Sequence, residues 1–221
     1  MKLYRFRYSP YARKVQLVLD LLGHPYESIE VKYGDRSELV RVTGGYIYVP
    51  VLVSDDGNVT VESRAICEQL LSRDGGAKLV PEALAGPIWA YHDFCDGALE
   101  DVLFRIASPA IQRAWADPWE RALYTLVKER KFGAGCVDLW LRERPELVQR
   151  GRYLLAPTIT TLERQPFLFG EQPTFADAAL YGNLAMLHEG DPALLDAFPT
   201  TLRRFFERLE RAASSTSKLR Q

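Results

Sequence analysis

A hydroxyl at the start of a helix, directly after a short strand, is the feature that most constrains the fold of this chain. Residues 3–7 predict the strand, and the apolar spacing after them predicts a helix from Pro10 to about Leu22. Ser9 suits the N-cap of that helix, Pro10 its first position and Gly23 the residue after its last turn. Because a helix N-terminus carries free amides and partial positive charge, an anion is favoured beside Ser9.

Two roles are open to Ser9 on this pattern alone. It can cap the helix and do nothing else, which is what most such serines do. Alternatively, its hydroxyl can donate a hydrogen bond to a bound thiolate and lower the pKa of that thiol. The segments that come next in the chain favour the second role.

A proline interrupts the strand-like run Tyr46–Val53. Pro50 belongs at an edge, a strand start or a bend, often with a cis peptide bond. A turn and a second short strand, Asn58–Val61, complete a hairpin. Glu62 and Ser63 then open another helix, whose free amides can bind a carboxylate while Glu62 binds an amine.

Composition excludes several classes of function. A formal net charge of −1, from 28 basic and 29 acidic residues, argues against nucleic acid or an anionic membrane as partner. No apolar run approaches transmembrane length, and the N-terminus lacks a signal-peptide pattern. The three cysteines are widely spaced, which suits a reducing cytoplasm better than a disulfide framework. With three histidines, no metal-ligand cluster is expected.

Glycine and proline mark a domain boundary after the first third of the chain. Asp74-Gly75-Gly76 ends the first unit, and the remaining sequence predicts helices only. We therefore predict a first domain at 1–76, a linker at 77–87, a helical domain at 88–212 and a frayed tail at 213–221. In the helical domain, Thr174 and Asp177 are spaced as a capping box, and we expect them to stabilise a helix, not to catalyse.

Four segments in this order resemble the glutathione transferase superfamily, in particular its serine-type, bacterial-like members. They are Ser9–Val15, Val49–Leu52, Glu62-Ser63 and Phe169–Asp177. The resemblance spans nearly the whole chain. It implies an α/β, thioredoxin-like N-terminal domain, an all-α C-terminal domain, a glutathione site on the first domain and a homodimer.

The residue that would activate the thiol of glutathione is Ser9, which stands where serine-type members of the superfamily carry theirs. Tyr8 and Tyr4 are the rivals, because a phenol is a stronger hydrogen-bond donor and tyrosine-type members use one near the first strand. No cysteine lies near the helix start. This excludes mixed-disulfide chemistry, and with it the function of a disulfide reductase.

The rest of the glutathione site follows from the chemistry of a tripeptide with two carboxylates and one amine. Val49, before a cis Pro50, would bind the cysteinyl backbone in the manner of an added strand. Ser63 would bind the γ-glutamyl carboxylate and Glu62 the amine. The glycyl carboxylate needs a cation, and the candidates are Lys32, Arg36 and Arg41. Here the chain departs from the family, since Thr43-Gly44-Gly45-Tyr46 stands where members commonly have Asn-Pro.

The second substrate leaves a weaker signal. Its cleft would lie between the domains, and four aromatic residues are candidate walls, although core packing explains each of them as well: Tyr11, Tyr91, Phe104 and Trp115. Arg13 and Lys14 are expected to form a solvated helix face.

The function that this pattern predicts is conjugation of reduced glutathione, as co-substrate, to a small, largely apolar electrophile. A cytoplasmic, metal-free detoxification enzyme would fit. Glutathione-dependent isomerisation or dehalogenation would use the same apparatus. The alternative from another class is a non-catalytic, glutathione transferase-like binding or regulatory protein.

Overall fold

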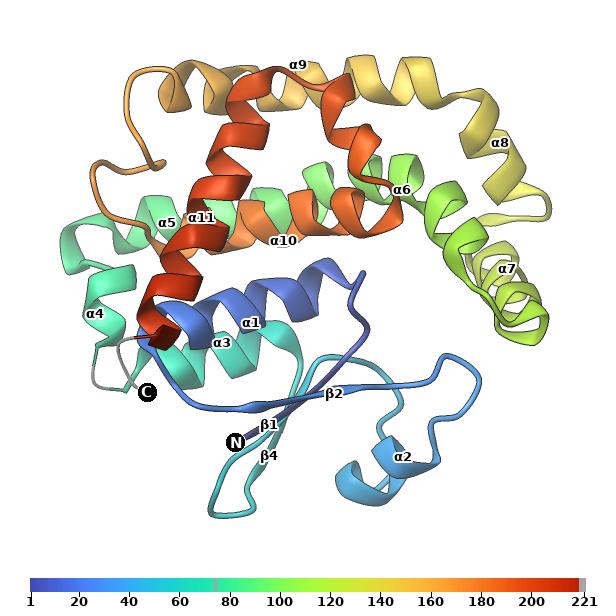
Figure 1. Cartoon of the computed structure of the whole chain (residues 1–221), viewed down its shortest axis with the longest axis horizontal. Coiled ribbons are helices and arrows are strands. Elements are labelled where there is room, and N and C mark those ends of the chain that lie inside the picture. The colour runs from blue at the N-terminus through green and yellow to red at the C-terminus, as the bar shows by residue number, and fades with distance from the viewer. Residues whose placement is uncertain (74, 219–221) are drawn as a thin grey trace.

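The computed structural model describes residues 1–73 and 75–218, and it shows a small α/β unit beneath a larger helical unit (Figure 1). One four-stranded sheet has the order β2-β1-β3-β4. β1 pairs parallel with β2 and antiparallel with β3, which also pairs antiparallel with β4. The strands and helices of this unit are β1 (Lys2–Arg5), α1 (Pro10–Leu22), β2 (Glu27–Glu30), α2 (Ser37–Thr43), β3 (Val51–Val53), β4 (Val59–Val61) and α3 (Ser63–Leu71).

Apart from turns, loops and an isolated β-bridge between Phe167 and Gly170, the rest of the described chain is helical. This arrangement, a mixed sheet with its helices followed by an all-helical domain, confirms the thioredoxin-like and all-α fold that the sequence predicts. The helical elements are α4 (Gly76–Leu79), η1 (Glu82–Leu84), α5 (Ala85–Phe94), the π-helical turn η2 (Cys95–Leu99), α6 (Glu100–Ala114), α7 (Pro118–Phe132), α8 (Cys136–Arg142), α9 (Arg144–Leu162), α10 (Phe175–Gly190), η3 (Pro192–Ala197) and α11 (Thr200–Lys218).

The predicted linker and tail contain helical residues that were not predicted from the sequence. The predicted linker contains α4, η1 and the start of α5. α11 extends to Lys218, into the predicted tail, while Asp74 and residues 219–221 lie outside the described residues. Among the described helices, none is long and apolar enough to cross a membrane.

α1 joins the two units, because it lies between the sheet and α10 (Figure 1). Its ends are where local sequence places them: the Ser9 Oγ accepts a hydrogen bond from the Ala12 amide at 3.3 Å, and Gly23 ends the helix with φ 67°. Gly182 of α10 permits the close approach of α1, since a Cβ there would lie 2.3 Å from the Pro10 carbonyl oxygen.

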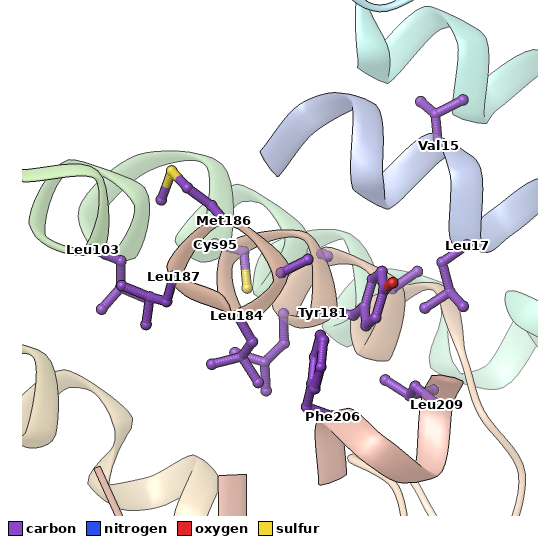
Figure 2. Close-up of a cluster of buried hydrophobic side chains, with 14 of the residues drawn as sticks. Val15, Leu17, Cys95, Leu103, Tyr181, Leu184, Met186, Leu187, Phe206 and Leu209 are labelled. Carbon is purple, nitrogen blue, oxygen red and sulfur yellow. The ribbon is translucent and has the colours of Figure 1, made fainter. Parts of the chain in front are cut away.

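α10 forms the centre of the core. Every residue from Phe175 to Leu187 is buried, as expected for a helix that is covered on all sides. Figure 2 shows Leu184, Met186 and Leu187 of α10 among side chains contributed by α1, α6 and α11. The N-terminus of α10 is held by a capping box of Thr174 and Asp177. Packing on this one helix therefore fixes where the start of α1 lies.

Candidate functional site

A cavity of about 550 Å³ lies where the α/β unit meets α5 and η2. Loop residues before β3, the start of α3 and the first turn of α1 all contribute to its wall. The lining residues are Tyr11, Tyr46, Tyr48, Val49, Pro50, Glu62, Ser63, Arg64, His92, Asp93, Asp96 and Gly97. The structure thus brings together four residues predicted to bind glutathione, from two separate segments: Val49, Pro50, Glu62 and Ser63.

The Val49–Pro50 peptide bond is cis, as predicted. Within the part of the chain that the structure describes, no protein group hydrogen-bonds to the N–H or C=O of Val49. Both groups are therefore available to the backbone of an extended ligand, which would pair with them as a neighbouring strand does.

Glu62 has an unusual backbone conformation for a side chain of its size, with φ 68° and ψ 124°. Its carboxylate accepts a hydrogen bond from the Tyr46 hydroxyl at 2.6 Å. Non-glycine residues with positive φ are uncommon, and such strain gathers at ligand sites. Ser63 follows as the first residue of α3, with its side chain in the wall of the cavity.

Ser9 is not itself a lining residue of this cavity, whereas Tyr11, the second residue of the same helix, is. Ser9 is buried and its hydroxyl occupies the N-cap of α1. The bond that it accepts from Ala12 uses a lone pair and leaves the hydroxyl hydrogen free to donate. Capping and thiolate donation are therefore compatible roles for this residue.

Neither rival tyrosine lines the cavity. The Tyr4 hydroxyl donates to the Glu38 carboxylate at 3.2 Å, and burial together with that carboxylate raises the pKa of Tyr4. The Tyr8 ring stacks on Phe6 at 5.4 Å and meets Trp115 edge-on at 5.8 Å. Burial raises the pKa of Tyr8 well above its ordinary value, so the phenol keeps its proton.

The three candidate cations for the glycyl carboxylate have different surroundings. Lys32 lines a separate hollow. Arg41 is exposed and lies 3.9 Å from Glu38. The Arg36 guanidinium packs 4.6 Å from the Phe6 ring centroid and donates to the Ile47 carbonyl at 2.6 Å, next to Tyr48 of the cavity. Arg36 is therefore the candidate that the fold brings toward the cavity.

Of the four predicted walls of a second-substrate cleft, only Tyr11 lines this cavity. The Tyr91 hydroxyl bonds to Thr158 at 2.8 Å, between α5 and α9. The Phe104 ring packs against Phe132 and Trp140 in a small cluster of α6, α7 and α8. Trp115 lines a different cavity. Tyr91 and Phe104 therefore contribute to packing within the helical unit and not to the wall of this cavity.

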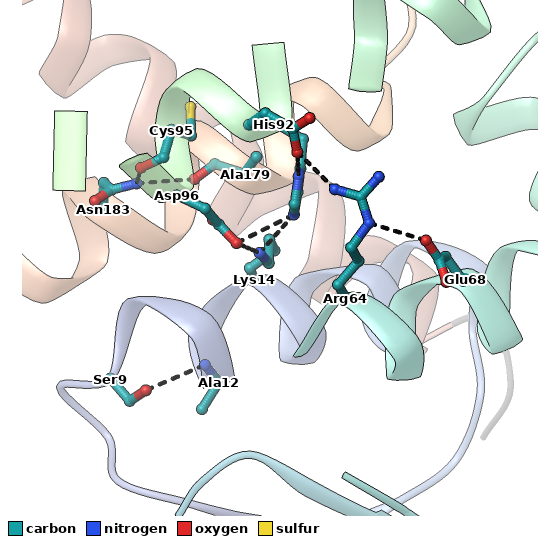
Figure 3. Close-up of polar contacts among 11 residues, drawn as sticks. Ser9, Ala12, Lys14, Arg64, Glu68, His92, Cys95, Asp96, Ala179 and Asn183 are labelled. Atoms are coloured by element: carbon teal, nitrogen blue, oxygen red, sulfur yellow. Dashed lines mark hydrogen bonds and ion pairs between the residues drawn. The ribbon is translucent and has the colours of Figure 1, made fainter. Parts of the chain in front are cut away.

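The expectation that Arg13 and Lys14 form a solvated helix face is wrong. The Lys14 side chain is 1% exposed, and its ammonium lies 2.5 Å from the Asp96 carboxylate and 2.9 Å from the Nε2 of His92 (Figure 3). Arg13 donates to the Tyr181 hydroxyl at 2.7 Å. Both side chains cross from α1 to the helical unit.

The Lys14, His92 and Asp96 cluster reaches the cavity, because His92 and Asp96 are in its wall. Burial raises the pKa of Asp96, but the hydrogen bond from His92 and the charge of Lys14 outweigh it and leave that pKa below its ordinary value. The π-helical turn η2 positions Asp96, and Asn183 of α10 donates to the Cys95 carbonyl at 3.1 Å (Figure 3).

A second ionic link joins the two units at the edge of the same cavity. Arg64 of α3 donates to the Asp93 carboxylate at 2.6 Å and to Glu68 at 3.0 Å. Asp93 in turn lies 3.0 Å from the Nδ1 of His92. These residues were missed in the sequence, because only the four-residue spacing of Arg64 and Glu68 gives a local signal.

The wall of this cavity combines polar and aromatic residues. Free backbone groups, a helix N-terminus and carboxylates stand ready for an amino-acid-like ligand, while Tyr11, Tyr46 and Tyr48 supply apolar surface. In the described ranges 1–73 and 75–218, no group of three or more His, Cys, Asp or Glu residues is arranged to hold a metal ion.

Two family models match this chain, and solved structures share its fold. A model of the glutathione S-transferase N-terminal domain matches residues 3–78, and a model of the C-terminal domain of the same family matches 142–212. Glutathione transferase GSTFuA3 from Phanerochaete chrysosporium is 18% identical, with TM-score 0.80 over 96% of both chains.

Two bacterial structures are similar along nearly the whole chain. A glutathione S-transferase from Pseudomonas fluorescens is 26% identical, with TM-score 0.61 over 94% of this chain and 92% of its own. One from Methylobacillus flagellatus, solved with glutathione bound, is 20% identical, with TM-score 0.66 over 98% of both chains. The two family models match in the expected order and together span more than half of the sequence, so this chain belongs to the glutathione S-transferase family.

Proposed function

We propose that this protein is a glutathione transferase that conjugates reduced glutathione to a small, largely apolar electrophile. The observation that carries the proposal is the convergence of Val49, Pro50, Glu62 and Ser63 on one cavity beside the first turn of α1. Family membership and the glutathione-bound relative from Methylobacillus flagellatus support the same ligand.

Each part of glutathione would meet a group suited to it. The cysteinyl backbone pairs with Val49, and the γ-glutamyl carboxylate with Ser63 at the N-terminus of α3. Glu62 binds the amine. Arg36 binds the glycyl carboxylate, because its hydrogen bond to the Ile47 carbonyl holds it near the cavity. Lys32 is the weaker candidate.

The thiol would lie toward the N-terminus of α1, where the Ser9 hydroxyl donates to the thiolate. A negative charge there is stabilised by the free amides of the first turn and by the helix dipole. Lowering the thiol pKa raises the fraction of thiolate, the nucleophilic form, at neutral pH. The thiolate then attacks the electrophile directly, so the reaction needs no covalent bond to the enzyme.

Isomerisation and dehalogenation start from the same thiolate and remain within this proposal as reaction types. A non-catalytic glutathione-binding protein is the alternative, and a Ser9 hydroxyl that donates to the thiolate would favour the transferase, because binding alone needs no donor at the thiol. We also propose a cytoplasmic, detoxifying role and a homodimer. Apolar residues of α6 such as Val102 and Ile106 are buried within one chain and do not form a free apolar surface. The support for the dimer is therefore family membership.

Ser63→Ala is expected to weaken glutathione binding by roughly 10- to 100-fold, since a hydrogen bond to a charged group contributes about 1.5–3 kcal/mol. Isothermal titration calorimetry with glutathione measures this directly. Ser72→Ala is the matched control, because Ser72 ends the same helix and donates only to the Gln69 carbonyl. Equal affinity in all three proteins would place glutathione outside this cavity.

A further inference from the structure

The Nε2 atom of His92 faces two groups that make opposite demands on it. The Lys14 ammonium lies 2.9 Å away and can only donate a hydrogen bond, whereas the Asp96 carboxylate lies 3.2 Å away and can only accept one (Figure 3). A single ring nitrogen serves one of these groups at a time. Without a proton Nε2 accepts from Lys14, and with a proton it donates to Asp96.

The other ring nitrogen and both faces of the His92 ring are held in either state. Nδ1 lies 3.0 Å from the Asp93 carboxylate, so it carries the proton of the neutral ring. Trp89 meets the ring edge-on at 5.3 Å, and Phe175 of α10 stacks on it at 5.1 Å. The side chain is 2% exposed. The two states therefore differ by the proton on Nε2 and not by a rotation of the ring.

Each cation beside the neutral ring already has a carboxylate partner. Lys14 lies 2.5 Å from Asp96, and Arg64 donates to Asp93 at 2.6 Å. A proton on Nε2 places a further positive charge 2.9 Å from the Lys14 ammonium. Because the Lys14 side chain is 1% exposed, water and salt screen this repulsion only weakly.

The titratable groups around His92 keep their own charge in mild acid. Against the effect of burial, the hydrogen bond from His92 and the nearby ammonium lower the pKa of Asp96, and the hydrogen bond from His92 lowers the pKa of Asp93. Burial raises the pKa of Cys67 to about 12 and that of Tyr11 above its ordinary value, so both stay protonated. In the described part of the chain, the charged groups of this cluster are Lys14 of α1, Arg64 and Glu68 of α3, Asp93 of α5 and Asp96 of η2.

The contact between Lys14 and His92 joins the two units of the molecule. Lys14 belongs to α1, whose N-terminus carries Ser9, whereas His92 belongs to α5 of the helical unit. His92 and Asp96 are also part of the wall of the cavity that contains Ser63. A proton on Nε2 therefore acts on the position of α1 and on this wall together.

We propose that His92 is a proton switch in the link between the α/β unit and the helical unit. In neutral solution the ring accepts a hydrogen bond from Lys14 and joins α1 to α5. In mild acid Nε2 binds a proton, donates to Asp96 and gives up its contact with Lys14, so that the imidazolium and the ammonium compete for one carboxylate. The switch is a property of the fold and does not rest on transferase activity.

Nitrogen-15 NMR of protein labelled at histidine reads the two ring nitrogens separately. At about pH 8 we expect Nδ1 of His92 to carry a proton and Nε2 to carry none, and at about pH 5 we expect both to carry one. The signals are assigned by their absence in His92→Gln, and His24 and His188 serve as references in the same sample. A proton on Nε2 at the higher pH, or none at the lower pH, would overturn the proposal.

Lys14→Met tests the same contact through stability, with His92→Gln as the control background. The amide oxygen of a glutamine accepts from Lys14 at any pH, so this background keeps the neutral arrangement. In the wild-type background, the loss of melting temperature caused by Lys14→Met at about pH 5 should be less than about half of the loss at about pH 8, because the imidazolium then pairs with Asp96.

In the His92→Gln background the two losses should be equal. Equal losses at both pH values in the wild-type background, or the same pH dependence in both backgrounds, would contradict the switch. If Lys14→Met does not fold, the NMR titration of the wild-type protein decides alone.

Discussion

Asp96→Ala is expected to lower the free energy of unfolding by about 3 kcal/mol, because it leaves the buried Lys14 ammonium without its carboxylate. The Lys14 side chain is 1% exposed, and its remaining polar neighbour is His92. The expected loss lies at the lower end of the range for buried ion pairs, because the Asp96 side chain is itself 23% exposed. Urea denaturation followed by circular dichroism measures the loss.

Asp93→Ala is the matched control for this prediction. Asp93 lies three residues away and also pairs with a cation of the α/β unit, Arg64, but its side chain is 59% exposed. Exposed pairs contribute about 1 kcal/mol or less. Adding Lys14→Met to Asp96→Ala should restore much of the stability, because the unpaired charge is then gone. Equal losses from Asp96→Ala and Asp93→Ala would contradict a buried link between the two units.

Asp177→Ala is expected to destabilise the helical unit by about 3–5 kcal/mol, because it leaves three donors without an acceptor in a buried place. The carboxylate accepts from the Leu168 amide at 2.8 Å, and from both the amide and the hydroxyl of Thr174 at 2.7 Å. Asp177→Asn should lose less, since its amide oxygen still accepts one of these bonds. Thermal unfolding of the two variants gives the comparison.

The same residue predicts a pH dependence with a definite sign. Burial raises the pKa of Asp177 to about 6, against the lowering effect of its hydrogen bonds. A folded-state pKa above the unfolded value of 3.8 means that folding favours the protonated acid. Protonation of Asp177 therefore adds to the free energy of unfolding, and this added part is fully present below about pH 4 and is lost as the pH rises through about 6. Wild type and Asp177→Asn should diverge in this window and run parallel above it.

Local signals account for the parts of the fold that the sequence predicted well. Ser9, Pro10 and Gly23 act within one turn of the helix ends that they set, so α1 begins and ends where expected. Pro50 and the turn after it identify the hairpin for the same reason. The capping box at Thr174 also acts over three residues, and the helix after it forms as predicted.

The parts that the sequence could not predict depend on residues far apart in the chain. Lys14 looks like an ordinary surface lysine until α5 and η2 bring His92 and Asp96, 78 and 82 residues away, onto it. From the sequence alone, Trp115 and Phe104 could each line a cleft or pack in a core. The packing of α6 against α7 and α8 shows that Phe104 is a core residue. The strained backbone of Glu62 has no signature in the sequence either.

The measurement that tests the central claim most directly is a titration of the glutathione thiol in its complex with the protein, followed by the ultraviolet absorbance of the thiolate. The account predicts a pKa well below about 8.5, the ordinary value of a cysteine thiol. Ser9→Ala should raise that pKa, although part of the lowering should remain because the N-terminus of α1 is still present. If glutathione binds to the wild-type protein and its thiol titrates as it does in free solution, the transferase proposal is wrong and the protein is a glutathione-binding protein without this catalytic function.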